Sequence, residues 1–214
     1  MKYNKMIFAT HNQGKLEQIR TILKLYNLNV DVICSKDVKY FEDVEENGET
    51  FRENAEIKAN ALYYYCKNRG IDDSIIFADD SGLCVDNLDG QPGVYSSRYA
   101  GENASEDDKR NKVLSLMEKY IDDEDRKASF ITEMVAILPD GSKIETKGEC
   151  RGKIAKEMGK TSNRLTYNQI FIPDGFDKPI SEMNEQEFKK VHNHREQALL
   201  KLINELKIKG VLYM

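Results

Sequence analysis

The sequence predicts a mixed α/β fold because strand patterns and helix patterns alternate along its first half. Buried-strand runs at 5–9 and 74–78 alternate with helical spacing at 16–26 and 51–70. Two further strand patterns, 128–138 and 142–149, flank Pro139-Asp140-Gly141, which is a β-hairpin signal. The 214 residues are expected to form a single domain, 1–214, with two lobes.

Composition narrows the class of protein. The net charge of −5 argues against a protein that coats the nucleic-acid backbone, although a local lysine cluster can still bind a small anion. No run of about 18 apolar residues is present, so no membrane partner is expected. The first residues lack a secretory signal pattern, which makes a cytoplasmic location the expectation. The four cysteines are scattered and predict reduced thiols.

A polar loop links the first strand to the first helix. It reads Thr10-His11-Asn12-Gln13-Gly14-Lys15. It is not a P-loop, because that motif needs glycine at position 9 and serine or threonine at 16, where the chain has Ala9 and Leu16. Backbone amides at the helix start and Lys15 can still bind an anion. The alternative is an ordinary turn with Asn12 as the helix N-cap.

The second helix begins at a capping box, Thr50-Phe51-Arg52-Glu53. Glu53 is explained by that box, whereas Glu45 and Glu46 have no comparable local role. Lys58 follows on the helix about one turn after Asn54. Taken alone, the acidic segment is more simply explained as a solvated loop.

The stretch "FADDSGLCVD", residues 77–86, carries adjacent carboxylates directly after a buried strand. We expect the strand to end at Asp79 and Asp80, since ligands bind at the carboxyl ends of strands in open α/β sheets. Carboxylates together with a distant glutamate suit Mg²⁺; the alternative is a turn held by backbone N–H groups. Adjacent strand residues point opposite ways, so Asp79 can instead hydrogen-bond into the scaffold.

The last third of the chain adds a basic segment, a strand-like run at 168–172 and a closing helix. The basic segment reads Lys189-Lys190-Val191-His192-Asn193-His194-Arg195. Positive charge near a helix start is disfavoured by the helix dipole, which mildly favours a role in binding an anion or a base. Together, the four polar segments describe a site for Mg²⁺ and a triphosphate.

Four motifs, spread over nearly the whole chain, together form a recognisable signature. The first matching motifs are Ala9-Thr10-x-Asn12-x-Gly14-Lys15 and Gly48-x-Thr50-Phe51-x-Glu53-Asn54-Ala55. The most specific block is Asp79-Asp80-Ser81-Gly82-Leu83-x-Val85-Asp86, continued by Gly90-x-Pro92-Gly93-Val94-Tyr95-Ser96-Ser97-Arg98-Tyr99-Ala100-Gly101. The last motif is His194-Arg195-x-x-Ala198-Leu199. By these motifs the chain resembles the inosine-triphosphate pyrophosphatase family over nearly its whole length.

This resemblance implies a fold, an assembly and a reaction. The fold is an elongated mixed β-sheet flanked by helices, with two lobes around a central nucleotide cleft, and the assembly is a homodimer. The reaction is Mg²⁺-dependent hydrolysis of ITP, dITP and XTP to the nucleoside monophosphate and pyrophosphate, which keeps deaminated purines out of nucleic acids.

The resemblance also implies residue roles. Thr10 to Lys15 would cradle the phosphates, and Lys58 would touch phosphate. Glu46 would bind Mg²⁺, and Asp80 would bind Mg²⁺ or act as the general base. Ser81, Lys189, His194 and Arg195 would hold the nucleotide, the last two near its base.

One segment departs from the family pattern. Where the family has Phe-Gly-Tyr (or Trp)-Asp-Pro, this chain has Leu165-Thr166-Tyr167-Asn168-Gln169. An aromatic side chain that could stack on the base is lost, and a carboxylate becomes an amide. Changed contacts to a base edge can shift specificity, so two alternatives stay open: another modified or pyrimidine nucleotide as substrate, or a nucleotide-binding protein without turnover.

Overall fold

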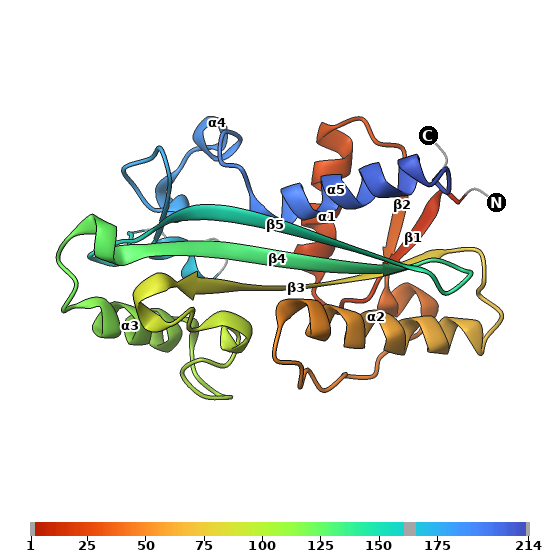
Figure 1. Ribbon diagram of the computed structural model, residues 1–214, viewed down its shortest axis with the longest axis horizontal. Helices are drawn as coiled ribbons and strands as arrows, with labels where there is room; N and C mark the ends of the chain where they lie inside the picture. Colours follow the sequence, from red (N-terminus) through yellow and green to blue (C-terminus); the bar gives the residue numbers. More distant parts are fainter. Residues whose placement is uncertain (1–2, 161–165, 213–214) are drawn as a thin grey trace. The chain divides into compact units, whose positions relative to one another are not determined.

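The computed structural model describes residues 3–160 and 166–212 (Figure 1). Its strands are β1 (Lys5–Phe8), β2 (Asp31–Cys34), β3 (Ile75–Val85), β4 (Lys127–Ile137), β5 (Lys143–Ile154) and β6 (Phe171–Pro173). Its α-helices are α1 (Gln13–Leu25), α2 (Phe51–Lys67), α3 (Glu106–Met117), α4 (Glu185–Phe188) and α5 (His194–Ile208). No helix in the described part of the chain is both long enough and apolar enough to cross a membrane.

The sheet is mixed. Its strand order is β2-β1-β3-β4-β5-β6. β1 runs parallel to both of its neighbours, β2 and β3, whereas β5 and β6 are antiparallel. The predicted mixed α/β class is therefore confirmed.

The chain separates into two compact units. The first comprises residues 1–80, 132–148 and 195–214, and the second comprises residues 81–131 and 149–194. β3, β4 and β5 each contribute residues to both units.

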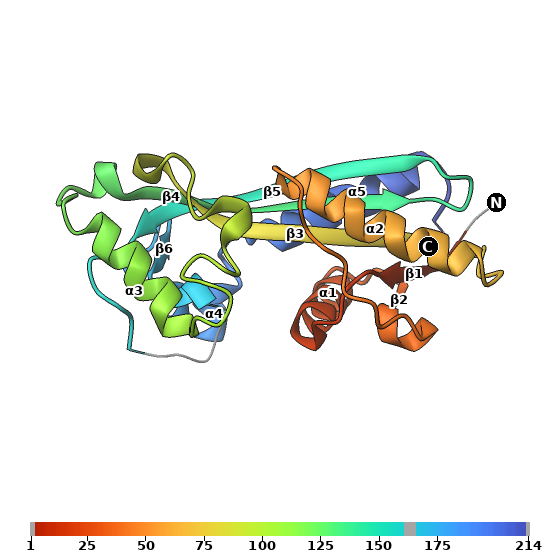
Figure 2. The ribbon, with the colours of Figure 1, turned by 90° about the horizontal axis from the view of Figure 1, so that it is seen from below.

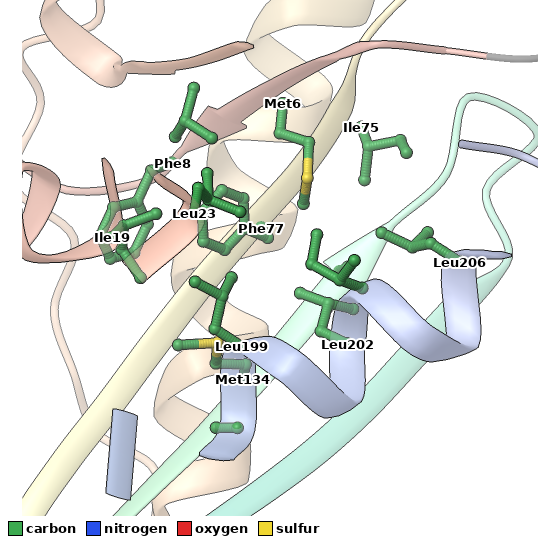
Figure 3. Packing of buried hydrophobic residues seen from close by; sticks show 14 of the residues in the cluster. Met6, Phe8, Ile19, Leu23, Ile75, Phe77, Met134, Leu199, Leu202 and Leu206 are labelled. Atoms are coloured by element: carbon green, nitrogen blue, oxygen red, sulfur yellow. The ribbon is translucent and has the colours of Figure 1, made fainter. Parts of the chain in front are cut away.

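The core of the first unit follows the two-residue period of its strands. Met6, Phe8 and Phe77 point to the face covered by α1 and α5, while Ile7 and Ile76 point to the face covered by α2. Figures 1 and 2 show α5 and α2 on opposite faces of these strands. Figure 3 shows the α5 leucines directed toward the strand side chains. Burying each such side chain contributes about 1.5–3 kcal/mol.

The second unit has a core of its own. α3 contributes Val113 and Met117, which pack with Leu83 and Val85 of β3 and with Phe130 of β4. The Phe130 and Phe171 rings meet edge to face with centroids 4.7 Å apart. Each unit therefore buries its own apolar cluster, as a chain of this length is expected to do.

The helix starts follow the predicted signals. Asn12 accepts a hydrogen bond from the Lys15 amide at the start of α1. Thr50 and Glu53 form the reciprocal capping box of α2, and Ser105 and Asp108 form another at α3. These side chains satisfy amides that have no partner inside the helix.

The predicted and observed strands differ in several places. β2 was not predicted. The run at 168–172 divides instead into a 3₁₀ helix, Thr166–Gln169, and the short β6, because the Ile170 amide bonds back to the Tyr167 carbonyl. Apolar spacing alone does not distinguish such a turn from a short strand.

Candidate active site

The loop after β1 presents backbone amides at the start of α1. Gln13 and Gly14 open the helix, where N–H groups have no partner within the helix itself. A Cβ at Gly14 would lie 3.2 Å from the Asn12 Oδ1 atom, so glycine suits this crowded turn. The N-cap interpretation is confirmed: Asn12 accepts from the Lys15 amide, while the Gln13 and Gly14 amides have no partner within the helix, as an anion site would require.

His11 connects this loop to a neighbouring segment. Its Nε2 atom lies 3.2 Å from the Tyr40 carbonyl, and its Nδ1 atom lies 3.5 Å from an Asp43 carboxylate oxygen. The Thr10 hydroxyl accepts a hydrogen bond from the Asn12 amide. Thr10 and His11 therefore help to shape the loop.

Asp79 is buried between two cations. Its Oδ1 atom lies 3.0 Å from Lys15 Nζ, and its Oδ2 atom lies 3.0 Å from Arg195 Nε. Arg195 also donates to Gln18 Oε1 of α1 at 2.7 Å. Asp79 and Arg195 are each 2% exposed. β3 thus holds the ends of α1 and α5 through one carboxylate.

The charges around Asp79 decide its protonation state. Burial alone would raise the pKa of this carboxyl, but the Lys15 and Arg195 charges hold it well below its ordinary value. Asp79 therefore stays ionised across the neutral range. It neutralises a lysine and an arginine that would be costly to bury alone.

Asp80 has a different environment, formed with α2 and the segment before it. Its Oδ2 atom accepts a hydrogen bond from Asn54 Nδ2 at 3.1 Å, and its Oδ1 atom lies 3.6 Å from Lys58 Nζ. The same ammonium group donates to Glu46 Oε2 at 2.8 Å. Glu46 and Asp80 therefore converge on one point, which Lys58 reaches from α2.

The pKa of Asp80 moves in the opposite direction to that of Asp79. Burial raises the pKa of the Asp80 carboxyl; the Lys58 charge lowers it and the Glu46 charge raises it, and the net shift is upward. Burial lowers the pKa of Lys58, but Asp80, Asp79 and Glu46 together raise it. Two carboxylates, Glu46 and Asp80, thus contact the same ammonium group, and burial is the main cause that raises the pKa of Asp80.

The donor set suits a hard divalent cation. Glu46 and Asp80 supply carboxylate oxygens, the ligand type that Mg²⁺ prefers. In the described residues there is no group of three or more histidine, cysteine, aspartate or glutamate side chains that could hold a metal ion.

The structure corrects the predicted end of the third strand. β3 continues through Asp79 and Asp80 to Val85 rather than ending at them. It is β1 that ends here, at Phe8, which pairs with Phe77. The carboxylates therefore lie just past the carboxyl end of β1, and their charges are offset by residues distant in sequence. Asp79 and Asp80 bond to different partners, as expected for two side chains that point in opposite directions.

The remaining predicted site residues lie in the second unit, except Leu165, which is outside the described residues. Ser81 is half-buried on β3, and Lys189 is exposed at the end of α4. The Tyr167 hydroxyl donates to the Ser96 carbonyl at 2.8 Å, and Asn168 is buried.

Thr166 and His194 are also held by neighbours in this unit. The Thr166 carbonyl accepts a hydrogen bond from Arg110 at 2.7 Å, and its hydroxyl contacts Glu106. The buried His194 ring stacks on Phe130 with centroids 5.2 Å apart. These contacts fix the side chains that sequence analysis assigned to the nucleotide.

Two residues at the site were not assigned a role from sequence. Asn54 was noted only as part of a motif, yet it contacts Asp80 directly. Its spacing one turn before Lys58 was the available signal, since both side chains then share a helix face. Gln18 gave no signal, because its partner Arg195 is 177 residues away.

The family comparison covers most of the chain. The model of the Ham1 family matches residues 6–205. A protein of Clostridium perfringens described as a dITP/XTP pyrophosphatase is 39% identical over 208 residues, which are 97% of this chain and 98% of that protein. A Bacillus subtilis protein with the same description is 38% identical, covering 92% of this chain and 93% of its own length.

Solved structures with the same family name or the same description are also similar to this chain. The Staphylococcus aureus Ham1 protein has a TM-score of 0.79 and 32% identity, covering 96% of this chain and 99% of its own. A nucleoside-triphosphatase, or dITP/XTP pyrophosphatase, from Mycobacterium abscessus has a TM-score of 0.73 and 31% identity, covering 94% and 99%.

Proposed function

Because the chain belongs to the Ham1 family, we propose that it hydrolyses dITP, XTP and ITP to the nucleoside monophosphate and pyrophosphate. Relatives described as dITP/XTP pyrophosphatases match 97% and 92% of it. The observation that carries the proposal at the level of the site is the convergence of Glu46 and Asp80 on Lys58 Nζ. The biological role is removal of deaminated purine nucleotides before they enter DNA or RNA.

Mg²⁺ is the proposed cofactor, held by Glu46 and Asp80. Their oxygens fit this ion because both are carboxylates that converge on one point, the Lys58 ammonium group. When bound, Mg²⁺ supplies positive charge for the phosphate oxygens.

The chain's own residues perform the remaining tasks. The first-turn amides of α1 and the ammonium of Lys15 bind phosphate oxygens and offset the charge of the leaving pyrophosphate. Asp80 orients a water, or accepts its proton, as the water attacks the α-phosphorus. The bond to the bridging oxygen breaks, and pyrophosphate leaves with that oxygen. Positioning and charge neutralisation supply most of the rate.

The base is assigned to the second unit. Ser81, Thr166, Tyr167, Asn168, Lys189 and His194 are the proposed nucleotide contacts there, together with Leu165. The buried amide of Asn168 can both donate and accept hydrogen bonds, so it is compatible with a purine that carries a carbonyl at C6. Arg195 bonds to Asp79, so its proposed effect on the nucleotide acts through the Asp79–Lys15 pair. The homodimer and the cytoplasmic location stay predictions.

A substrate panel tests this function. Purified protein is incubated with dITP, XTP, ITP, the four standard ribonucleotides and their deoxy forms, with Mg²⁺ or with EDTA. We expect pyrophosphate and monophosphate from the deaminated purines, and no product in EDTA. A preference for a pyrimidine or another modified nucleotide would establish the altered-specificity alternative. Tight ITP binding with no hydrolysis of any nucleotide would establish the binding protein.

A further inference from the structure

Asn54 joins two parts of the candidate active site. The residue lies on α2 and is 1% exposed. Its Oδ1 atom accepts a hydrogen bond from the Gly48 amide at 2.8 Å, and its Nδ2 atom donates to Asp80 Oδ2 at 3.1 Å. One carboxamide thus connects the segment that carries Glu46 to the strand that carries Asp80.

The chemistry of the partners fixes the orientation of this amide. The Gly48 N–H group can only donate, so the oxygen of Asn54 must face it. The NH₂ group then faces Asp80 and directs that carboxylate, whose other oxygen lies 3.6 Å from Lys58 Nζ. Rotating the amide would place two donors together at Gly48 and two acceptors together at Asp80.

The segment before α2 is built to approach Asn54 closely. A Cβ at Gly48 would lie 2.7 Å from Asn54 Oδ1 and 2.7 Å from Glu53 Cβ, so a side chain at position 48 would push the segment away. The amides of Glu49 and Thr50 both donate to Glu53 Oε2. Glu46 is therefore only two residues from Gly48, whose amide is bonded to a side chain of α2.

Helix capping does not explain Asn54. The N-cap of α2 is Thr50, whose side chain accepts from the Glu53 amide, and Glu53 completes the box. The Asn54 side chain bonds outside the helix, to the preceding segment and to β3. Burying a carboxamide is favourable only when both its ends are satisfied, and here both partners belong to the site.

We propose that Asn54 is a positioning residue that sets the separation and orientation of the Glu46 and Asp80 carboxylates, and so controls how tightly the site binds a divalent cation. The inference rests on the proposed roles of Glu46 and Asp80, while the bonds of Asn54 are independent of them. Side chains that orient ligating carboxylates affect metal affinity or activity by about 10- to 100-fold when removed.

Two substitutions separate the two ends of the amide. Asn54→Leu removes both hydrogen bonds at similar volume. Asn54→Asp keeps an acceptor for the Gly48 amide but removes the donor to Asp80. Asn60→Asp is the matched control, because Asn60 lies on the same helix and its substitution changes the charge in the same way. Circular dichroism and the Tm verify folding, and Gly48→Ala breaks the same link from its other end if Asn54→Leu does not fold.

Three readouts are compared with the parent. Hydrogen exchange reports the Gly48 amide, Mn²⁺ titration by electron paramagnetic resonance reports cation affinity without turnover, and dITP hydrolysis gives kcat and KM. Asn54→Leu is expected to expose the Gly48 amide to exchange and to weaken Mn²⁺ binding by about 10- to 100-fold. Asn54→Asp is expected to keep Gly48 protected and to lower kcat rather than raise KM. Asn60→Asp should match the parent.

Unchanged Gly48 exchange or unchanged Mn²⁺ affinity in Asn54→Leu would overturn the proposal, as would a parent-like kcat in Asn54→Asp. An inactive parent would instead refute the proposed function. Gly48 exchange and Mn²⁺ binding would then still decide the role of Asn54, because neither depends on turnover.

Discussion

Asp79 and Asp80 are neighbours in sequence with opposite physical environments. Asp79 is 2% exposed and lies 3.0 Å from each of two cations, Lys15 and Arg195. Asp80 has an amide partner and a lysine at 3.6 Å, and it shares that lysine with Glu46. The pKa of Asp79 is lowered and that of Asp80 is raised, although burial raises both.

The difference shows how two adjacent residues of one strand can have different roles, one in stabilising the fold and the other in the proposed reaction. Successive side chains of β3 point to opposite faces, so one carboxylate meets α1 and α5 while the next meets α2. The protein itself neutralises Asp79. At Asp80 and Glu46 two carboxylates contact one lysine, and this is where we propose that a cation binds.

The largest expected effect tests the proposed catalytic role of Asp80. Asp80→Asn should lower kcat for dITP by about 100- to 10,000-fold, because the variant loses a proton acceptor and a cation ligand. Its free energy of unfolding should change by less than about 1 kcal/mol, since the new amide still offers an oxygen to Asn54. Steady-state pyrophosphate release measures the first quantity, and urea unfolding measures the second.

Asp86→Asn is the matched control for that substitution. Asp86 follows β3 in the same acidic stretch and is exposed. The variant should keep the kcat of the parent within about twofold, because an exposed surface carboxylate contributes little. A similar fall in kcat in both variants would show that Asp80 acts only through the net charge of the segment.

The next effect is the pH dependence of stability, which belongs to Asp79. A carboxyl with a lowered folded-state pKa stabilises the protein above its unfolded pKa, and that contribution is lost as the pH falls toward the folded value. The stability gap between the parent and Asp79→Asn should be constant from pH 7 to about pH 5. It should narrow by about 1.4 kcal/mol per pH unit below the ordinary value of 3.8.

Urea unfolding of both proteins at pH 7, 5, 4 and 3 measures this gap. Asp80→Asn serves as the comparison, because the raised pKa of Asp80 gives the opposite sign: protonation favours the folded state as the pH falls. A gap for Asp79→Asn that widens on acidification would contradict the assignment of Asp79 as an ionised partner of Lys15 and Arg195.

The smallest expected effect is a loss of stability when a buried hydrogen bond between uncharged groups is removed. The Tyr167 hydroxyl donates to the Ser96 carbonyl in the core of the second unit. Tyr167→Phe should cost about 1 kcal/mol, well below the cost of removing Asp79. Tyr120→Phe, which loses an exposed hydrogen bond to the Asn87 carbonyl, is the control and should cost less. Equal losses would show that burial does not set the strength of these bonds.

Local signals predicted the parts of the fold that depend on neighbours in sequence. The caps at Asn12 and Thr50 are confirmed, and so is the hairpin around Pro139-Asp140-Gly141, where β4 and β5 flank the turn. These features depend on residues three or four positions apart, so the sequence displays them directly.

Contacts between distant residues were not predictable in the same way. Two adjacent carboxylates normally mark the end of a strand, yet β3 continues because Asp79 meets Lys15, 64 residues away, and Arg195, 116 residues away. The resemblance selected Glu46, Lys58 and Asp80, and the structure brings these three side chains together. The resemblance did not indicate the link through Asn54, because that link depends on the orientation of one buried amide.

The separation of roles between the two aspartates is tested most directly by comparing the unfolding free energies of Asp79→Asn and Asp80→Asn in urea at pH 7. We expect a loss of about 3–5 kcal/mol for Asp79→Asn, because the buried Arg195 and the half-buried Lys15 then lose the carboxylate between them. We expect little change for Asp80→Asn. Equal losses, or a larger loss for Asp80→Asn, would contradict this separation of roles.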